Sequence, residues 1–263
     1  MFLDPEGQTV KQELHSKFAS YFSFAYGLNR YANELSSNAS IPDGDLQQLL
    51  LAPLMLRGLT TFQGCILLVE RGLSAEAKIL ARSLLEILFR ITAIAKNREN
   101  AEIYVLEDQP FRRKLINKSK LLSPCLRQPF ETEQTEHLAR EIKSDIEERN
   151  IAEKSTQWWA QEAGLSDLYN SAYPIFSLAV HVGSRELESH LVLDKDRRIV
   201  AMKIDADTTN LGLIVISACE SLLLVFEAAS TILPKNSKIK MSIFKTELAK
   251  LNRLVKNSKS QVS

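Results

Sequence analysis

The sequence is poor in the motifs that most often reveal an enzyme. Its 263 residues include only nine glycines, and none forms a phosphate-cradling loop pattern or a G-x-S-x-G nucleophile elbow. The three cysteines, Cys65, Cys125 and Cys219, are far apart without a C-x-x-C pair, and no His/Cys/carboxylate spacing is typical of zinc. We therefore expect no metal, no cofactor, and reduced, buried thiols in a cytoplasmic protein.

An excess of charge and a targeting signal are also missing. Lys and Arg total 33 against 32 for Asp and Glu, so nothing global attracts the chain to nucleic acid or anionic lipid. Residues 1–8 have neither the basic nor the apolar part of a secretory signal. The one run long enough to span a bilayer, residues 211–233, contains Glu220 and Glu227. Since such charges are costly in hydrocarbon, we predict a buried core helix there and no membrane contact.

Apolar residues recur every three or four positions along most of the chain, as in α-helices. The predicted helices cover residues 10–35, 45–70 with a bend near Pro53, 74–96, one or two segments around Pro110, 131–154, 166–181 with an interruption at Pro174, 207–232, and a basic C-terminal segment. Gly72 ends the second helix and Ser74 caps the third, while Asp207 or Thr208 caps the helix that follows.

The period changes near residues 190–204, where β-branched residues flank a polar D-K-D-R centre. This pattern predicts a small β-hairpin. The sequence contains no internal repeat and no low-complexity linker. It therefore predicts an all-α fold, with residues 1–263 forming a single bundle-like domain of seven or eight helices, one hairpin near 190–204, and a disordered tail from about residue 257.

The predicted helix 74–96 is apolar nearly all round, yet it carries Arg82 and Glu86 at its centre. These residues are one helical turn apart and can pair. One interpretation is a solvated salt bridge or a buried strut that orders the helices. The other is a binding or active pocket that Arg82 and Glu86 line.

A second polar stripe lies on the predicted helix 166–181. Tyr173, Ser177 and His181 are spaced i, i+4, i+8 and share one side of the helix. We predict that this stripe faces Arg82 and Glu86; the alternative is a buried His181 satisfied by a backbone carbonyl. His15 and His137 lie near the polar sides of their helices and are expected at the surface.

The stretches GLSAEAKILARSLLEILFR and LYNSAYPIFSLAVHVGS, about ninety residues apart, resemble a widespread bacterial family of helical proteins known only as a numbered domain of unknown function. The residues that match its pattern are Ala77, Leu80, Arg82, Ser83, Leu84, Glu86, Tyr169, Tyr173, Ser177, Val180 and His181. The resemblance covers roughly residues 46–183. It implies a helical fold and a bacterial origin, and it brings no established activity.

A looser likeness is to the helical HEPN ribonucleases of toxins and phage defence, which use an R-x4-6-H motif. Arg185 and His190 in RELESH have that spacing. Basic residues also cluster in 111–127 and in the C-terminal helix, where they could meet phosphates. We favour solvated helical faces, balanced by the acidic stretch 131–153.

Two functions remain open. The favoured one is a non-catalytic module that binds a partner protein or a small ligand, or forms a homodimer. It would have a buried polar pocket of Arg82, Glu86, Tyr173 and His181, with Tyr169 and Ser177 as further binding residues. The alternative is a metal-independent, RNase-like effector that acts on RNA. In that case His181 would act as general acid or base, Arg82 would stabilise phosphate charge, and Glu86 would orient Arg82.

Overall fold

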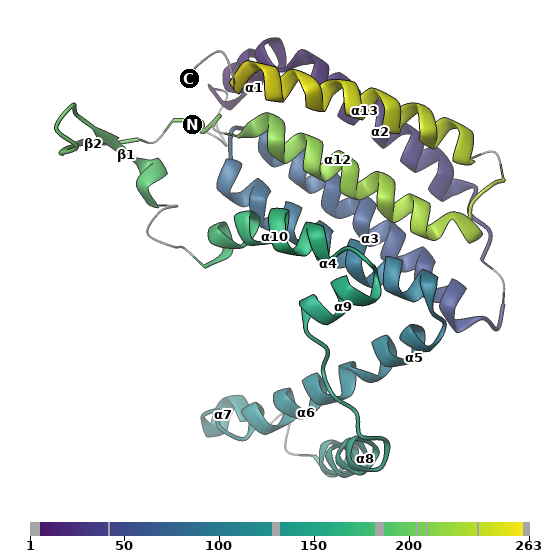
Figure 1. Cartoon of the computed structure of the whole chain (residues 1–263). Helices are drawn as coiled ribbons and strands as arrows, with labels where there is room; N and C mark the ends of the chain where they lie inside the picture. The colour runs from purple at the N-terminus through teal and green to yellow at the C-terminus, as the bar shows by residue number, and fades with distance from the viewer. Residues whose placement is uncertain are drawn as a thin grey trace.

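The computed structural model describes residues 6–41, 43–127, 132–181, 187–203, 205–208, 210–235 and 237–259. Its elements are α1 (Glu6–Lys17), α2 (Ala19–Ser37), α3 (Leu46–Val69), α4 (Ser74–Lys96), α5 (Glu99–Leu106), α6 (Asp108–Ser119), α7 (Pro124–Arg127), α8 (Glu133–Arg149), α9 (Thr156–Glu162), α10 (Ser166–Val180), η2 (Glu188–His190), β1 (Leu191–Leu193), β2 (Ile199–Met202), α12 (Leu211–Ala228), η3 (Ala229–Thr231) and α13 (Ser237–Lys259). The fold is mostly helical with one small hairpin, as predicted (Figure 1).

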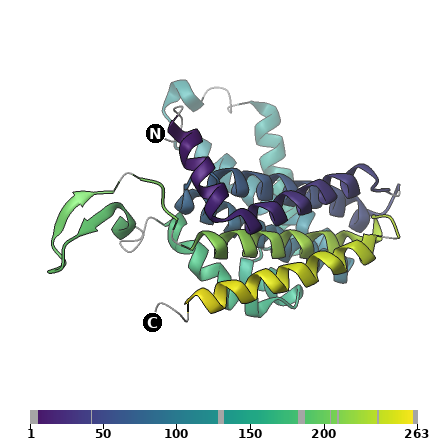
Figure 2. The same cartoon turned by 90° about the horizontal axis from the view of Figure 1, so that it is seen from above.

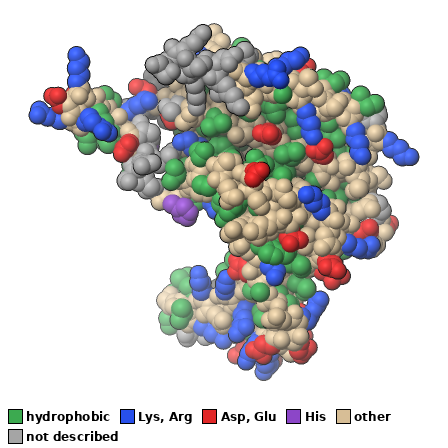
Figure 3. Space-filling model, in the orientation of Figure 1, with side chains coloured by type: hydrophobic (Ala, Val, Ile, Leu, Met, Phe, Trp, Pro, Cys, Tyr) green, Lys and Arg blue, Asp and Glu red, His purple; other side chains and the backbone are tan. Residues whose placement is uncertain are grey.

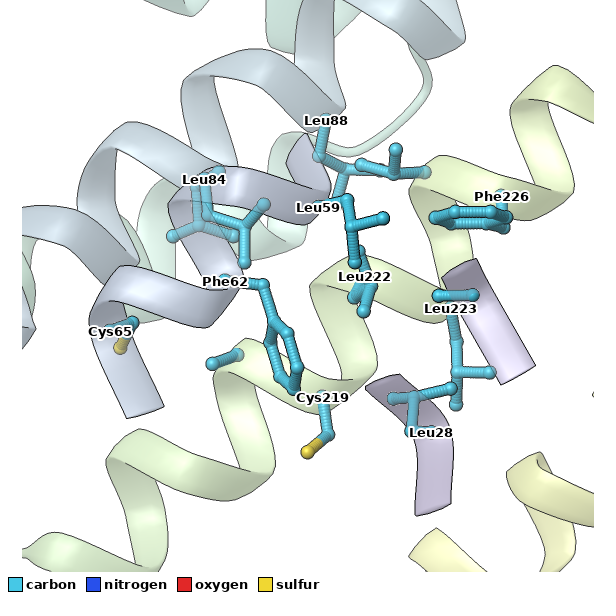
Figure 4. Close-up of a cluster of buried hydrophobic side chains, with 14 of the residues drawn as sticks. Leu28, Leu59, Phe62, Cys65, Leu84, Leu88, Cys219, Leu222, Leu223 and Phe226 are labelled. Carbon is cyan, nitrogen blue, oxygen red and sulfur yellow. The ribbon is translucent and has the colours of Figure 1, made fainter. Parts of the chain in front are cut away.

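The core lies where α3, α4 and α12 pack together. Figure 4 shows their side chains meeting, with Phe62 from α3, Leu84 and Leu88 from α4, and Leu222 from α12. All four are at most 1% exposed. Helix α4 also packs against α9 and α10. A helix surrounded in this way needs apolar side chains on nearly every side, which is the pattern that its sequence shows.

Two helical segments, Leu46–Val69 and Leu211–Thr231, are long and apolar enough to cross a membrane. In each, more than half of the most apolar window is buried inside the protein, 56% and 61% respectively. A core helix gives the same signal as a membrane span, so this observation says little about location. The burial agrees with the prediction of a core helix at residues 211–233.

Helices α2 and α13 cover α12 on the side away from α4. Figure 2 shows α12 running beside α13, and both α2 and α13 contact α12. The buried Tyr31 of α2 donates its hydroxyl hydrogen bond to the Ser237 carbonyl at 2.7 Å, which ties the start of α13 to α2. The Lys245–Glu227 ion pair links α13 to α12 at 2.6 Å.

The turn between α3 and α4 packs against the segment that precedes α12. Gly72 ends α3 as predicted, with a φ of +71° that favours glycine. Its carbonyl accepts a hydrogen bond from the Asp207 N–H at 2.9 Å, and a Cβ on Gly72 would lie 2.4 Å from the Ala206 Cβ. Residues 205–208 therefore pack directly onto this turn.

This packing explains why the predicted caps are wrong. The N-cap of α4 is Leu73, and the Ser74 hydroxyl instead donates to the Asp207 carbonyl at 2.5 Å. Helix α12 begins at Leu211, so neither Asp207 nor Thr208 is its cap. Its N-cap is Asn210, whose backbone has a φ of +59° and whose side chain makes no capping bond. The polar side chain of Ser74 joins two segments rather than closing a helix end.

Two parts project from the bundle (Figure 1). One, which we call the arm, consists of α6, α7 and α8. Thr132 caps α8 by accepting from the Thr135 N–H, and Ile142 is the one buried residue among Glu133–Arg149. The other is the β1–β2 hairpin, an antiparallel pair with Leu191 opposite Met202, in which all of β2 is exposed.

The helix boundaries differ from the prediction in two places. The predicted helix 10–35 breaks at Phe18 into α1 and α2. Helix α10 runs through Pro174 without interruption, because the ring and the Asn170 carbonyl that loses its partner lie on the exposed side of the helix. Helix α13 is assigned from Ser237 to Lys259, and the expected disorder from about residue 257 stays a prediction. Such breaks give more helices than the seven or eight expected.

The cysteines are free, but they are not all buried as expected. Cys65 and Cys219 lie in the core, while Cys125 on α7 is exposed. Burial raises the pKa of the Cys65 thiol to about 12. Burial, followed by the nearby Cys65, raises the pKa of Cys219 well above its ordinary value. Neither core thiol therefore ionises near neutral pH.

Candidate functional site

The predicted meeting of α4 and α10 is present in the structure, through three side chains. The Arg82 Nη2 donates to the Tyr173 hydroxyl at 2.7 Å, and this hydroxyl donates to the Glu86 Oε1 at 2.8 Å. The Arg82 Nη2 also lies 3.1 Å from the Glu86 Oε1. We call these three residues the Arg82 network. It joins residues that are 91 positions apart in the chain.

The network is held half-buried rather than sealed in the core. The Arg82 and Glu86 side chains are 24% and 28% exposed. The Arg82 guanidinium carbon also lies 5.0 Å from the centre of the Tyr173 ring, within the range of a cation–π contact. The phenol therefore holds the arginine in two ways, through its oxygen and through its face, and the arginine has little freedom to turn.

Aromatic rings pack beside the Arg82 network. Tyr169 lies one turn before Tyr173 on α10, and the two rings stack with centres 5.1 Å apart. Both rings contact Phe89 of α4, a fully buried residue, with ring centres 6.4 and 6.3 Å from the centre of the Phe89 ring. The predicted site residues Tyr169 and Tyr173 thus form one platform at the α4–α10 contact.

One donor in the network has no acceptor. The Arg82 Nε is buried, and among the described residues no group accepts a hydrogen bond from it. Leaving a buried donor unpaired costs about 1–3 kcal/mol, and more for a charged group. A side-chain cluster that served only to join two helices would gain by satisfying this group, so the unpaired N–H is a reason to look for a function.

The remaining predicted residues are outside the network. The Ser177 hydroxyl donates to the Tyr173 carbonyl of its own helix at 2.8 Å. His181 is the C-cap of α10 and is exposed, and within the described residues no hydrogen bond or ion pair joins it to Arg82, Glu86 or Tyr173. Its proposed acid–base role remains a prediction.

The HEPN-like pair cannot be assembled from the structure. Arg185 lies outside the described residues. His190 is exposed at the end of η2, immediately before β1. The prediction for Arg185 and His190 therefore has no support in the structure.

His15, expected at the surface, is half-buried rather than fully exposed. Its side chain is 30% exposed, its Nε2 lies 2.8 Å from an oxygen of the buried Glu70, and its ring stacks on Phe22 at 4.4 Å. Lys11 pairs with the other Glu70 oxygen at 2.9 Å. His137 is exposed, as predicted.

A second polar cluster that the sequence did not reveal surrounds Glu107, between α5 and α6. Its Oε2 accepts from the indole N–H of Trp159 at 3.2 Å, and its Oε1 lies 3.8 Å from the Arg90 Nε. Burial raises the pKa of this carboxyl, while the Arg90 charge and hydrogen bonds from the Lys154 backbone and Trp159 act against that rise. No signal in the sequence links Glu107 with Trp159.

Metal binding finds no support among the residues that can be placed. Across the described segments, no group of three or more His, Cys, Asp and Glu residues could hold a metal ion.

The comparison with protein families gives one match. Residues 48–199 match the model of a family of unknown function, DUF5677. The matched segment contains Arg82, Glu86 and Tyr173, and it extends from α3 into β2. No curated protein and no solved structure is significantly similar to the chain.

Proposed function

The chain belongs to the DUF5677 family, and from the geometry of the matched segment we propose that it is a non-catalytic binding module. In this proposal the Arg82 network is the ligand site. The observation that carries it is a pre-organised cluster from two distant helices that is about one quarter exposed and whose Arg82 Nε has no acceptor in the part of the chain that the structure describes.

The proposal depends on how the network is positioned. Arg82 is fixed by Glu86 and by both the hydroxyl and the ring of Tyr173, so little side-chain entropy is lost when a ligand binds. Arginine and tyrosine are also the side chains that most often contribute strongly to binding sites. A ligand would therefore meet a rigid donor beside an aromatic platform.

The chemistry of the network favours an aromatic carboxylate. A carboxylate can accept two parallel hydrogen bonds from a guanidinium. A ligand carboxylate could therefore replace the Glu86 Oε1, which lies 3.1 Å from the Arg82 Nη2. An aromatic ring attached to it could extend the Tyr169–Tyr173 stack. The exposed Ile79, one turn before Arg82 on α4, adds apolar surface near the site.

Benzoate is a direct probe of this proposal. We expect benzoate to raise the melting temperature of the protein, and acetate, which has no ring, to do so much less. Arg82→Gln should abolish the benzoate effect. The matched control is Arg112→Gln, because Arg112 forms an i,i+4 pair with Asp108 on α6 that is largely exposed to water. This variant should respond like the wild type.

Two results would overturn the proposal. One is that benzoate at high millimolar concentration leaves the melting temperature of the wild type unchanged, or raises that of Arg82→Gln as much as that of the wild type. The other is RNA cleavage by the wild type that His181→Ala abolishes, since that would make the protein an enzyme. Circular dichroism of each variant would show that it remains folded.

A further inference from the structure

The arm carries a groove whose charge differs from the prediction of a balanced surface. The groove lies between α6 and α8, has a volume of about 610 Å³, and is lined by Arg113, Lys120, Arg140 and Lys143 with the single carboxylate Glu136. These residues carry a net charge of +3. In Figure 3 the arm is the lower lobe, where Lys and Arg side chains gather.

The acidic residues of α8 offset only part of the positive charge of this groove. A neighbouring groove of about 550 Å³ between the same two helices is lined by Asp108, Glu141, Asp145 and Glu148 with only Arg112 opposing them. Its net charge is −3. The arm thus separates its charges into two grooves of opposite sign, which a surface selected only for solubility would intersperse.

The basic side chains are also largely free to bind. Within the described segments, no carboxylate lies within 4 Å of the guanidinium of Arg113 or Arg140, or of the ammonium of Lys120. By contrast, Arg112 and Lys114 on the same helix pair with Asp108 and Glu153. Three of the four cations that line the groove thus have no carboxylate partner among the described residues, while Lys143 lies 3.9 Å from Glu147.

We propose that this groove binds the phosphates of a small molecule that carries a phosphate chain. Two guanidinium groups suit phosphate oxygens, which accept paired hydrogen bonds, and two ammonium groups add point charges. The net charge of +3 matches a ligand with two or three linked phosphates.

The lining favours such a ligand over a single strand of nucleic acid. Single-strand binding sites combine basic grooves with aromatic side chains on which bases stack. Among the residues that line this groove, the apolar ones are Ile116 and Ala139, and none is aromatic. Phosphates can bind here, whereas bases would find no platform.

Isothermal titration with inorganic tripolyphosphate and with ATP tests the proposal. We expect both to bind, and equal affinity would show that the phosphate chain alone is recognised, while tighter binding of ATP would point to a nucleoside phosphate. The variant Arg113→Gln/Arg140→Gln loses two charge-assisted contacts, so its affinity should fall roughly 100-fold. The control Arg112→Gln/Lys114→Gln removes the same charge from paired residues and should bind within about threefold of the wild type.

Three outcomes would overturn the proposal. The first is no binding of tripolyphosphate by the wild type. The second is an equal loss in both double variants, which would show that only net charge matters. The third is tight binding of a 12-nucleotide single-stranded RNA without binding of tripolyphosphate, which would make the groove a nucleic-acid site. All substitutions lie on the surface of the arm, and circular dichroism would show that the fold is retained.

Discussion

Replacing Tyr173 with phenylalanine tests whether the Arg82 network acts as one unit. The change removes only the hydroxyl, which accepts from Arg82 at 2.7 Å and donates to Glu86 at 2.8 Å. The phenylalanine ring keeps the cation–π contact with Arg82 and the stack on Tyr169. Any loss of stability is therefore due to the two hydrogen bonds.

The expected loss follows from the exposure of the network. A hydrogen bond to a charged group contributes about 1.5–3 kcal/mol to stability. Arg82 and Glu86 are 24% and 28% exposed, so water replaces part of each lost bond and their direct pair remains. We expect the free energy of unfolding to fall by about 1–2 kcal/mol for the two bonds together. For a chain of this size that lowers the melting temperature by about 2–8 °C.

Urea denaturation of four proteins measures the effect and its coupling. They are the wild type, Tyr173→Phe, Glu86→Gln and the double variant. Because the two side chains share a hydrogen bond, their combined loss should be smaller than the sum of the single losses by about 0.5–1.5 kcal/mol. Tyr169→Phe is the control, since within the described residues the Tyr169 hydroxyl has no hydrogen bond. Additive losses, or equal losses for Tyr173→Phe and Tyr169→Phe, would refute the network.

Two further predictions concern the turn before α4 and the buried carboxyl near α5. Gly72→Ala places a side chain at a φ of +71° and within 2.4 Å of the Ala206 Cβ. We expect the free energy of unfolding, measured by urea denaturation, to fall by about 2–3 kcal/mol. Ala206→Gly should partly restore it, and a fall of less than about 1 kcal/mol would contradict this account. For Glu107, burial raises the pKa in the folded protein, so its contribution to stability is present below the unfolded carboxyl pKa of about 4.3 and is lost as pH rises through the folded pKa. The wild type should therefore gain stability relative to Glu107→Gln between pH 7 and pH 4, and a constant difference across this range would show that the carboxyl does not titrate as inferred.

Much of the bundle could be predicted because apolar periodicity reports burial directly. Helices α3, α4 and α12 are apolar enough to identify as core elements from sequence alone. The break at Phe18 could not be predicted, because no proline or glycine lies there. The predicted caps are wrong for another reason. Ser74 and Asp207 are typical capping residues, but their tertiary contacts override this local preference.

The candidate site was predictable only in part. Arg82 and Glu86 stood out because charges are rare on an apolar helix, and Tyr173 followed from its spacing on α10. That spacing also included Ser177 and His181, yet the structure shows Ser177 bonded to its own helix and His181 exposed at the helix end. Periodicity gives the side of a helix on which a residue lies, but not whether the neighbouring helix reaches that far.

The contrast between the three thiols has a practical consequence for experiments on the arm. At neutral pH a maleimide dye reacts with ionised, accessible thiols, and among the cysteines only Cys125 is exposed. The natural sequence therefore accepts a single fluorophore on α7, without engineered substitutions. Its rotational freedom would report whether α7 keeps a fixed orientation when α6 and α8 hold a guest molecule between them.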